Sequence, residues 1–134
     1  MINLGFFPDW KQTDTLLFSS DTDTLSLLEP SLTDLSLSRR DEINLHELPF
    51  VRAHHGIAVI AQRVSVDAGA SRETVPAVFR WARSSEGWAA VLTQIRHLIN
   101  SGPGHHNYFD GPSDEVVVEF AVGEYNDDWW QRQA

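Results

Sequence analysis

Residues 75–101 read VPAVFRWARSSEGWAAVLTQIRHLINS and decide the fold class that the sequence predicts. Apolar and polar residues alternate over 75–83, which is typical of a strand. Ser84 or Ser85 can cap a helix directly behind it, and the Gly-Pro-Gly turn at 102–104 ends that helix. The apolar residues of the helix recur three and four positions apart and predict one face buried against a sheet. They are Trp88, Val91, Leu92, Ile95, Leu98 and Ile99.

Weaker patterns on both sides of this unit complete the prediction. Pro8 is expected to end the first strand, because proline donates no hydrogen bond to a sheet. Leucines three and four positions apart predict a helical region between Leu25 and Leu35, and Asn126 can cap a short last helix. Alternating residues predict the remaining strands, at residues 2–7, 15–19, 43–48, 56–66 and 115–122.

The predicted elements follow one another as β-β-α-β-β-β-α-β, with a turn at 67–71 and a polar loop at 105–114. Consecutive strands joined by short turns favour antiparallel pairing. We therefore predict an α+β fold, in which two main helices pack largely on one face of an antiparallel or mixed sheet of five to six strands. No repeat or linker divides the chain, so residues 1–134 are expected to form a single globular domain.

Composition excludes several classes of function. The chain has no cysteine, which rules out disulfides, thiolate metal sites and a cysteine nucleophile. Its 19 acidic and 10 basic side chains give a net charge of −9, which argues against binding to the phosphate backbone of nucleic acids. There is no secretory signal and no apolar run long enough to span a bilayer, so we expect a cytoplasmic protein that does not bind membranes.

The histidines suggest one alternative function, a small metal-dependent or acid–base enzyme. It would use the loop that holds His105, His106 and Asp110, together with His54 or His55. Neighbouring residues of an extended segment point to opposite sides, so neither adjacent histidine pair can easily share one ion. No serine lies in the Gly-x-Ser-x-Gly pattern of hydrolases. The sequence therefore predicts no catalytic residue, no metal site and no cofactor.

The segment 110–130 carries a different signal. It holds seven acids and no Lys or Arg, and aromatic residues lie in it and directly before it. Aromatic side chains anchor partner proteins, and acids attract a basic partner. We predict ten partner-binding residues: Tyr108, Phe109, Asp110, Glu119, Glu124, Tyr125, Asp127, Asp128, Trp129 and Trp130. The alternative is that the two tryptophans only cap the sheet and that Tyr108 and Phe109 tuck under their loop.

Four short motifs between residues 79 and 125 resemble those of a known class of proteins. They are Phe79-x-Trp81, Ser85-Glu86-Gly87-Trp88, Gly104-His105-His106-x-Tyr108-Phe109-Asp110, and a valine-rich strand that closes in Gly123-Glu124-Tyr125. Together they resemble small acidic bacterial immunity proteins, which neutralise a co-encoded toxin. Such proteins have many unrelated folds, so the resemblance implies a function and not an architecture. It implies a non-enzymatic inhibitor of a toxin domain, and the acidic charge makes a basic toxin domain the expected partner.

Overall fold

The computed structural model describes residues 1–133 and has an α+β fold built on two mixed sheets, one of five strands and one of four. The larger sheet has the order β4-β1-β2-β9-β8 and the smaller has the order β3-β5-β7-β6. The larger sheet consists of β1 (Ile2–Trp10), β2 (Thr13–Ser20), β4 (Val51–Ala53), β8 (His105–Tyr108) and β9 (Val117–Val122). The smaller consists of β3 (Glu42–Asn44), β5 (Ala58–Arg63), β6 (Gly69–Arg72) and β7 (Val78–Arg83). The α+β class is confirmed, but the strands do not form the single sheet of five to six strands that we expected.

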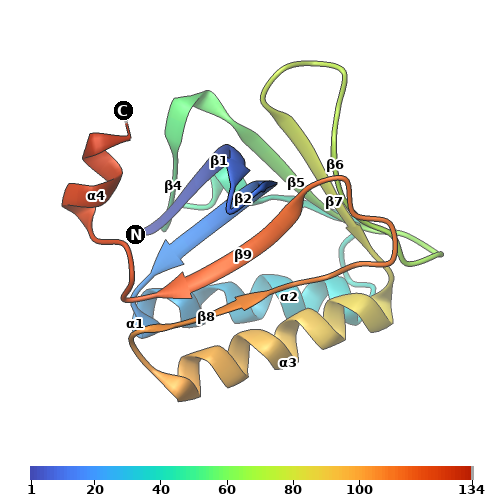
Figure 1. The fold of residues 1–134 in the computed structure, drawn as a ribbon. Coiled ribbons are helices and arrows are strands. Elements are labelled where there is room, and N and C mark those ends of the chain that lie inside the picture. Colours follow the sequence, from blue (N-terminus) through green and yellow to red (C-terminus); the bar gives the residue numbers. More distant parts are fainter. Residues whose placement is uncertain (134) are drawn as a thin grey trace.

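The helices are α1 (Thr22–Leu25), α2 (Glu29–Ser36), α3 (Ser85–Ser101) and α4 (Asp127–Arg132). Short 3-10 turns lie at Ser26–Leu28, Leu45–Glu47 and His54–Gly56. Figure 1 shows the two longer helices, α2 and α3, side by side along one side of the sheets, with α4 apart from them. Within residues 1–133, no helix is both long enough and apolar enough to cross a membrane.

Both sheets are mixed because strands that are not consecutive in the chain pair in parallel. β2 pairs with β9, β1 with β4, and β5 with β7 in this way. The remaining neighbours are antiparallel: β1 with β2, β8 with β9, β3 with β5, and β6 with β7. The N-terminal hairpin is therefore joined to the C-terminal strand β9, and purely antiparallel pairing is excluded.

The inner faces of the two sheets share one hydrophobic core. The Phe6 ring of β1 lies 4.8 Å from the Phe79 ring of β7, which joins the sheets directly. Within the larger sheet, the rings of Phe18 and Phe120 stack at 4.3 Å. Each buried aromatic side chain of this kind contributes about 2–3 kcal/mol through the area that it removes from water.

Helix α3 forms as predicted; it contacts β8 of the larger sheet, and Trp88 near its start packs on the smaller sheet. Ser84 is its N-cap, and the Ser84 hydroxyl accepts a hydrogen bond from the Gly87 amide at 3.0 Å. Trp88 is fully buried, contacts Trp81 edge-on at 4.9 Å, and donates from Nε1 to the Gln62 carbonyl at 3.0 Å. The predicted burial of Trp88 is therefore confirmed, and its one polar atom is satisfied.

Several local predictions are wrong for identifiable reasons. β1 continues past Pro8 to Trp10, because a bulge between Phe7 and Trp10 removes the need for an amide hydrogen there. β8 lies inside the expected loop at 105–114, where backbone pairing with β9 sustains a strand of polar residues. The expected turn at 67–71 contains the start of β6, and the strand expected at 43–48 gives way to a 3-10 turn after Asn44.

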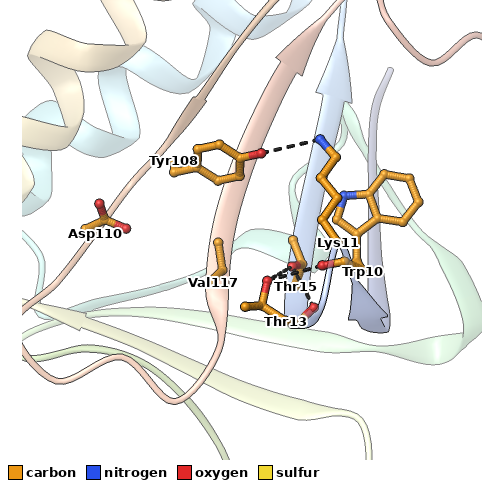
Figure 2. A pocket seen from close by; sticks show the side chains of 7 residues that line it. All are labelled: Trp10, Lys11, Thr13, Thr15, Tyr108, Asp110 and Val117. Atoms are coloured by element: carbon orange, nitrogen blue, oxygen red, sulfur yellow. Dashed lines mark hydrogen bonds between the residues drawn. The ribbon is translucent and has the colours of Figure 1, made fainter.

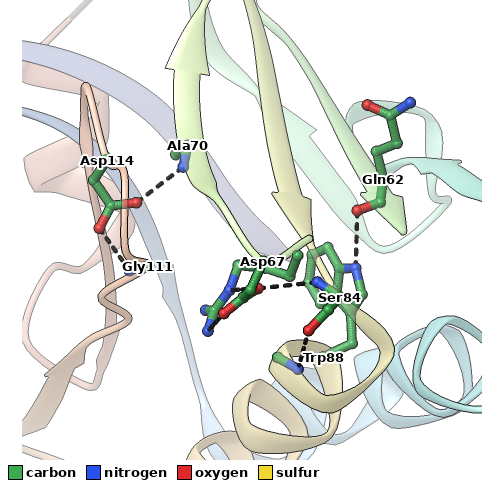
Figure 3. A network of polar contacts seen from close by, with 9 residues as sticks. Gln62, Asp67, Ala70, Ser84, Trp88, Gly111 and Asp114 are labelled. Atoms are coloured by element: carbon green, nitrogen blue, oxygen red, sulfur yellow. Dashed lines mark hydrogen bonds and ion pairs between the residues drawn. The ribbon is translucent and has the colours of Figure 1, made fainter. Parts of the chain in front are cut away.

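Figure 3 shows the polar contacts that hold the loop after β8, and the start of α3, on the smaller sheet. Asp114 accepts hydrogen bonds from the amides of Ala70 at 2.9 Å and Gly111 at 2.7 Å. Asp67 accepts from Arg83 Nε at 2.8 Å and Nη2 at 3.1 Å. These hydrogen bonds from Arg83 are the main cause of the lowered pKa of Asp67. Since the Arg83 side chain is only 7% exposed, the Asp67 carboxylate compensates a largely buried charge.

Candidate functional site

The outer face of the larger sheet, which points away from the shared core, carries a second hydrophobic cluster. Its buried members come from β2, β9 and α4 and are Leu17, Ala121 and Trp130. Four partly exposed aromatic side chains pack against them: Phe7, Trp10, Tyr125 and Trp129. We refer to these four residues as the aromatic ridge.

Trp130 attaches α4 to the sheet. Its ring lies over Gly5 of β1, where a Cβ atom would come within 2.7 Å of Trp130 Cζ3. His54 stacks on the same ring at 4.6 Å and donates from Nε2 to Asn3 Oδ1 at 2.9 Å. Burial, together with the nearby charge of Arg52, lowers the pKa of His54 and favours the neutral ring that this stacking uses.

The members of the aromatic ridge contact one another. Tyr125 and Trp129 lie 4.6 Å apart, and Trp10 lies 5.7 Å from each of them. Phe7 extends the row, with its ring 5.4 Å from Trp10. Asn126 caps α4 as predicted, and its side chain accepts a hydrogen bond from the Trp129 amide at 2.9 Å. Tilted and edge-on ring contacts of this kind are favourable, so the ridge is a preformed surface.

Acidic residues directly precede two members of the aromatic ridge in the chain, and we refer to Asp9, Asp127 and Asp128 as the border acids. Asp127 and Asp128 are exposed in the first turn of α4, directly before Trp129. The exposed Asp9 precedes Trp10 in the same way on β1. Carboxylates in the first turn of a helix are also favoured by the helix dipole, so the acids of α4 stabilise the element that carries them.

Glu119 of β9 is buried on the same face without a hydrogen bond. Its side chain is 0% exposed, and neither carboxylate oxygen has a hydrogen-bond partner. Asn3, Thr15 and Ser19, which are also buried on this face, each form a hydrogen bond. The indole nitrogens of Trp10 and Trp130 are buried without a partner, but they carry no charge. A buried carboxylate is costly unless a charge or a donor compensates it.

Lys11, the single lysine of the chain, supplies that charge from the turn between β1 and β2. Its Nζ lies 3.8 Å from Glu119 Oε1 and donates to the Tyr108 hydroxyl at 3.3 Å. The ammonium is also 5.7 Å from the Trp10 ring centroid and 5.9 Å from that of Tyr108, within range of a cation–π interaction. Trp10, Lys11 and Tyr108 line an open hollow, and Figure 2 shows their side chains. The volume of the hollow is about 300 Å³. Its remaining lining residues are Thr13, Thr15, Asp110 and Val117.

The turn that carries Lys11 has an unfavourable backbone. Trp10 pairs with Thr13, so Lys11 and Gln12 form a two-residue hairpin turn, and their φ angles are +49° and +74°. Turns with positive φ at both positions favour Asn and Gly, because other residues pay roughly 1–2 kcal/mol each in this conformation. The strained turn is the element that places the Lys11 ammonium beside Glu119.

The charges of this site shift two pKa values. Burial opposes the charged form of Lys11, but the hydrogen bond to Tyr108 and the charge of Glu119 outweigh it and raise the pKa of Lys11. Burial is the main cause of the raised pKa of Tyr125, and Glu119 and Glu124 add to it while Lys11 opposes it. At neutral pH the lysine is therefore protonated and the tyrosine is neutral.

Of the ten predicted partner-binding residues, three are buried. Phe109 lies in the shared core, with its ring stacked 4.8 Å from Phe120, so it is not part of an exposed loop surface. Glu119 is buried on the outer face beneath Lys11. Trp130 is buried on the same face because α4 holds its ring against the sheet. The other seven are exposed or partly exposed: Tyr108, Asp110, Glu124, Tyr125, Asp127, Asp128 and Trp129.

The β1–β2 hairpin also contributes to this face, which the sequence did not indicate. Phe7, Trp10 and Lys11 lie far from segment 110–130 in the chain, and only the fold brings them beside Tyr125 and Trp129. No local pattern in the sequence indicates this pairing, since Lys11 is one of ten basic residues of the chain.

The positions of the histidines do not assemble the alternative, metal-dependent site. His105 Nδ1 contacts the Gly102 carbonyl at 3.1 Å, and His106 Nδ1 donates to Glu124 Oε1 at 2.7 Å. As neighbours on β8, the two histidines point to opposite sides of the strand. Within residues 1–133, no group of three His, Asp or Glu side chains is placed to hold a metal ion.

No family model, no curated protein and no solved structure matches the chain.

Proposed function

We propose that the protein is a non-enzymatic binding module that neutralises a basic bacterial toxin domain in the cytoplasm, as the immunity proteins that it resembles do. The observation that carries this proposal is the aromatic ridge, in which four partly exposed aromatic side chains contact one another, and exposed acids directly precede two of them in the chain. Partly exposed Trp and Tyr side chains held in fixed positions are typical anchors of protein interfaces. Because the ridge is already ordered, binding would cost little side-chain entropy.

The negative charge of the protein also supports a basic partner. The chain has a net charge of −9, and the exposed Asp127 and Asp128 directly precede Trp129 in the first turn of α4. A negative surface steers a basic partner toward it and raises the association rate, mostly at low salt. A toxin domain that acts on nucleic acid needs a basic cleft, so carboxylates that take the place of phosphates would block it.

The test measures association and dissociation rates with the partner captured from the organism that encodes the chain. Asp127→Asn/Asp128→Asn removes two border acids, and Asp41→Asn/Glu86→Gln removes two exposed acids near α3 as a matched control. Both variants change the net charge by the same amount. We expect the border variant to slow association by about tenfold, and the control to have a smaller effect. The difference should shrink at salt concentrations where the screening length is about 8 Å or less.

Trp129→Ala tests the anchor separately. Truncation of an interface anchor costs about 1–2 kcal/mol or more, so dissociation should accelerate by about tenfold while association changes little. Equal effects of the border variant and its control, or an unchanged dissociation rate for Trp129→Ala, would contradict the proposal.

A further inference from the structure

Lys11 occupies a site with the composition of a cation-binding cage. The ammonium lies beside the rings of Trp10 and Tyr108 and next to the buried carboxylate of Glu119. Aromatic faces attract cations through their quadrupole, and a carboxylate adds a full opposite charge. The chain therefore holds, on its outer face, a receptor for an alkyl cation that its own lysine fills.

We propose that Lys11 is a displaceable occupant of this cage and that a cationic side chain of the partner protein takes its place beside Glu119. This inference rests on the proposed function and names the group that the partner inserts. It adds a specific, buried contact to the general charge attraction of the border acids.

The contacts of Lys11 are loose enough to be exchanged. Its Nζ lies 3.8 Å from Glu119, beyond hydrogen-bond distance, and both carboxylate oxygens remain without a donor. The Lys11 side chain is 48% exposed, whereas Glu119 is 0% exposed. A cation that donates directly to the two oxygens would form shorter, charge-assisted hydrogen bonds. The buried acceptor is thus better matched by an incoming group than by its resident lysine.

The turn geometry also favours displacement. Lys11 and Gln12 are exposed and hold positive φ angles, so their release would relieve backbone strain without disturbing the shared core. The hollow of about 300 Å³ beside them lies at the lower end of the size range of ligand pockets. It is lined by the same Trp10 and Tyr108 rings, so a long cationic side chain can follow the path that Lys11 now takes.

A small amine tests the cage without any partner protein. Lys11→Ala empties the cage, and n-butylammonium reproduces the end of the lost side chain. We expect Lys11→Ala to melt at a lower temperature than the wild type. We expect the amine to raise its Tm in a saturable manner, by about 5 °C at about ten times the Kd. The neutral analogue 1-butanol and an equal concentration of NaCl should give no such rise.

The double variant Lys11→Ala/Glu119→Gln is the matched control, because it removes the charge that the amine should meet. It should show no saturable response, and the wild type should show a much weaker one than Lys11→Ala. If Lys11→Ala does not fold, Lys11→Gly also empties the cage and suits the positive φ angle of residue 11, so it serves in the same experiment. The absence of a saturable response in the single variant, or an equal response in the double variant, overturns the cage.

The displacement itself is tested in the wild type with ¹⁵N-labelled lysine. The single lysine gives a single side-chain ammonium resonance, which should move to the position of a free lysine when the captured partner binds. An unchanged resonance in the complex overturns displacement even if the amine binds. Both results are distinguishable from failure of the proposed function, which is measured with the Asp127, Asp128 and Trp129 variants.

Discussion

Gly5→Ala is expected to destabilise the protein, although alanine is ordinarily better tolerated in a strand than glycine. Gly5 is not among the glycines with positive φ, so alanine can adopt its backbone conformation. The effect of the substitution therefore depends on the space around the added methyl group. A Cβ atom at this position would lie 2.7 Å from Trp130 Cζ3 and 3.0 Å from Phe7 Cε2. Carbon atoms prefer to be about 3.5–4.0 Å apart, so the Trp130 ring must move by roughly 1 Å and α4 must move with it.

The size of the effect follows from two opposing contributions. Overpacking lowers the free energy of unfolding by about 1–3 kcal/mol. Replacing glycine reduces the entropy of the unfolded chain, which raises the free energy of unfolding by about 0.5 kcal/mol. We expect Gly5→Ala to lower the free energy of unfolding by about 1–2 kcal/mol in the wild-type background. In the Trp130→Ala background the ring is absent, so the same change should be neutral or slightly stabilising.

The assay is urea unfolding of the four proteins of this double-mutant cycle, followed by circular dichroism. The cycle should give a coupling energy of about 2 kcal/mol between the two positions. A coupling energy below about 0.5 kcal/mol would refute the reasoning, because it would mean that Trp130 does not rest on Gly5.

Two further predictions concern pH. Asp67→Asn should lower the free energy of unfolding by about 2 kcal/mol at neutral pH, because it leaves the buried Arg83 without its carboxylate. Since Arg83 lowers the pKa of Asp67, the stability from this pair is present above the usual aspartate pKa of 3.8 and is lost as the pH falls below that value. The acid-induced decline in stability should therefore be shallower in the variant, and an equal slope would contradict this account. Burial lowers the pKa of His54, so a pH below its usual value of 6.5 should destabilise the stacking with Trp130. Hydrogen exchange should show weaker protection of the α4 amides at about pH 5 than at about pH 7, and His54→Gln should abolish that difference.

Local patterns predicted the elements whose environment is uniform along their length. The stripe that begins at Trp88 identified α3, because one helix face meets one core. The alternation of Val118 and Phe120 identified the inner face of β9 for the same reason. Periodicity reports how residues are spaced along one element, and in these two elements the spacing alone determines which side is buried.

The pairing of distant strands left no local pattern to find. Nothing in β2 indicates that its neighbour is β9, so the division into two sheets could not be predicted. The burial of Glu119 could not be predicted for the same reason. The alternation in β9 put Glu119 on the face away from Phe120, and its charge suggested that this face is exposed. The outer face is instead covered by α4 and by the Lys11 turn, which belong to opposite ends of the chain.

β9 lies inside the larger sheet, between β2 and β8, although it is the last strand of the described chain. Thr15 of β2 pairs with Val117, which is synthesised roughly a hundred residues later. Until then, the edge of the hairpin formed by β2 has no partner strand. At synthesis rates of about 5–20 residues per second, the β1–β2 hairpin remains open for roughly 5–20 s on the ribosome. Its open edge includes Leu16, Leu17 and Phe18, which form a ready template for strands of other chains. Ribosome stalling before β9 would thus release an aggregation-prone fragment instead of a smaller folded domain.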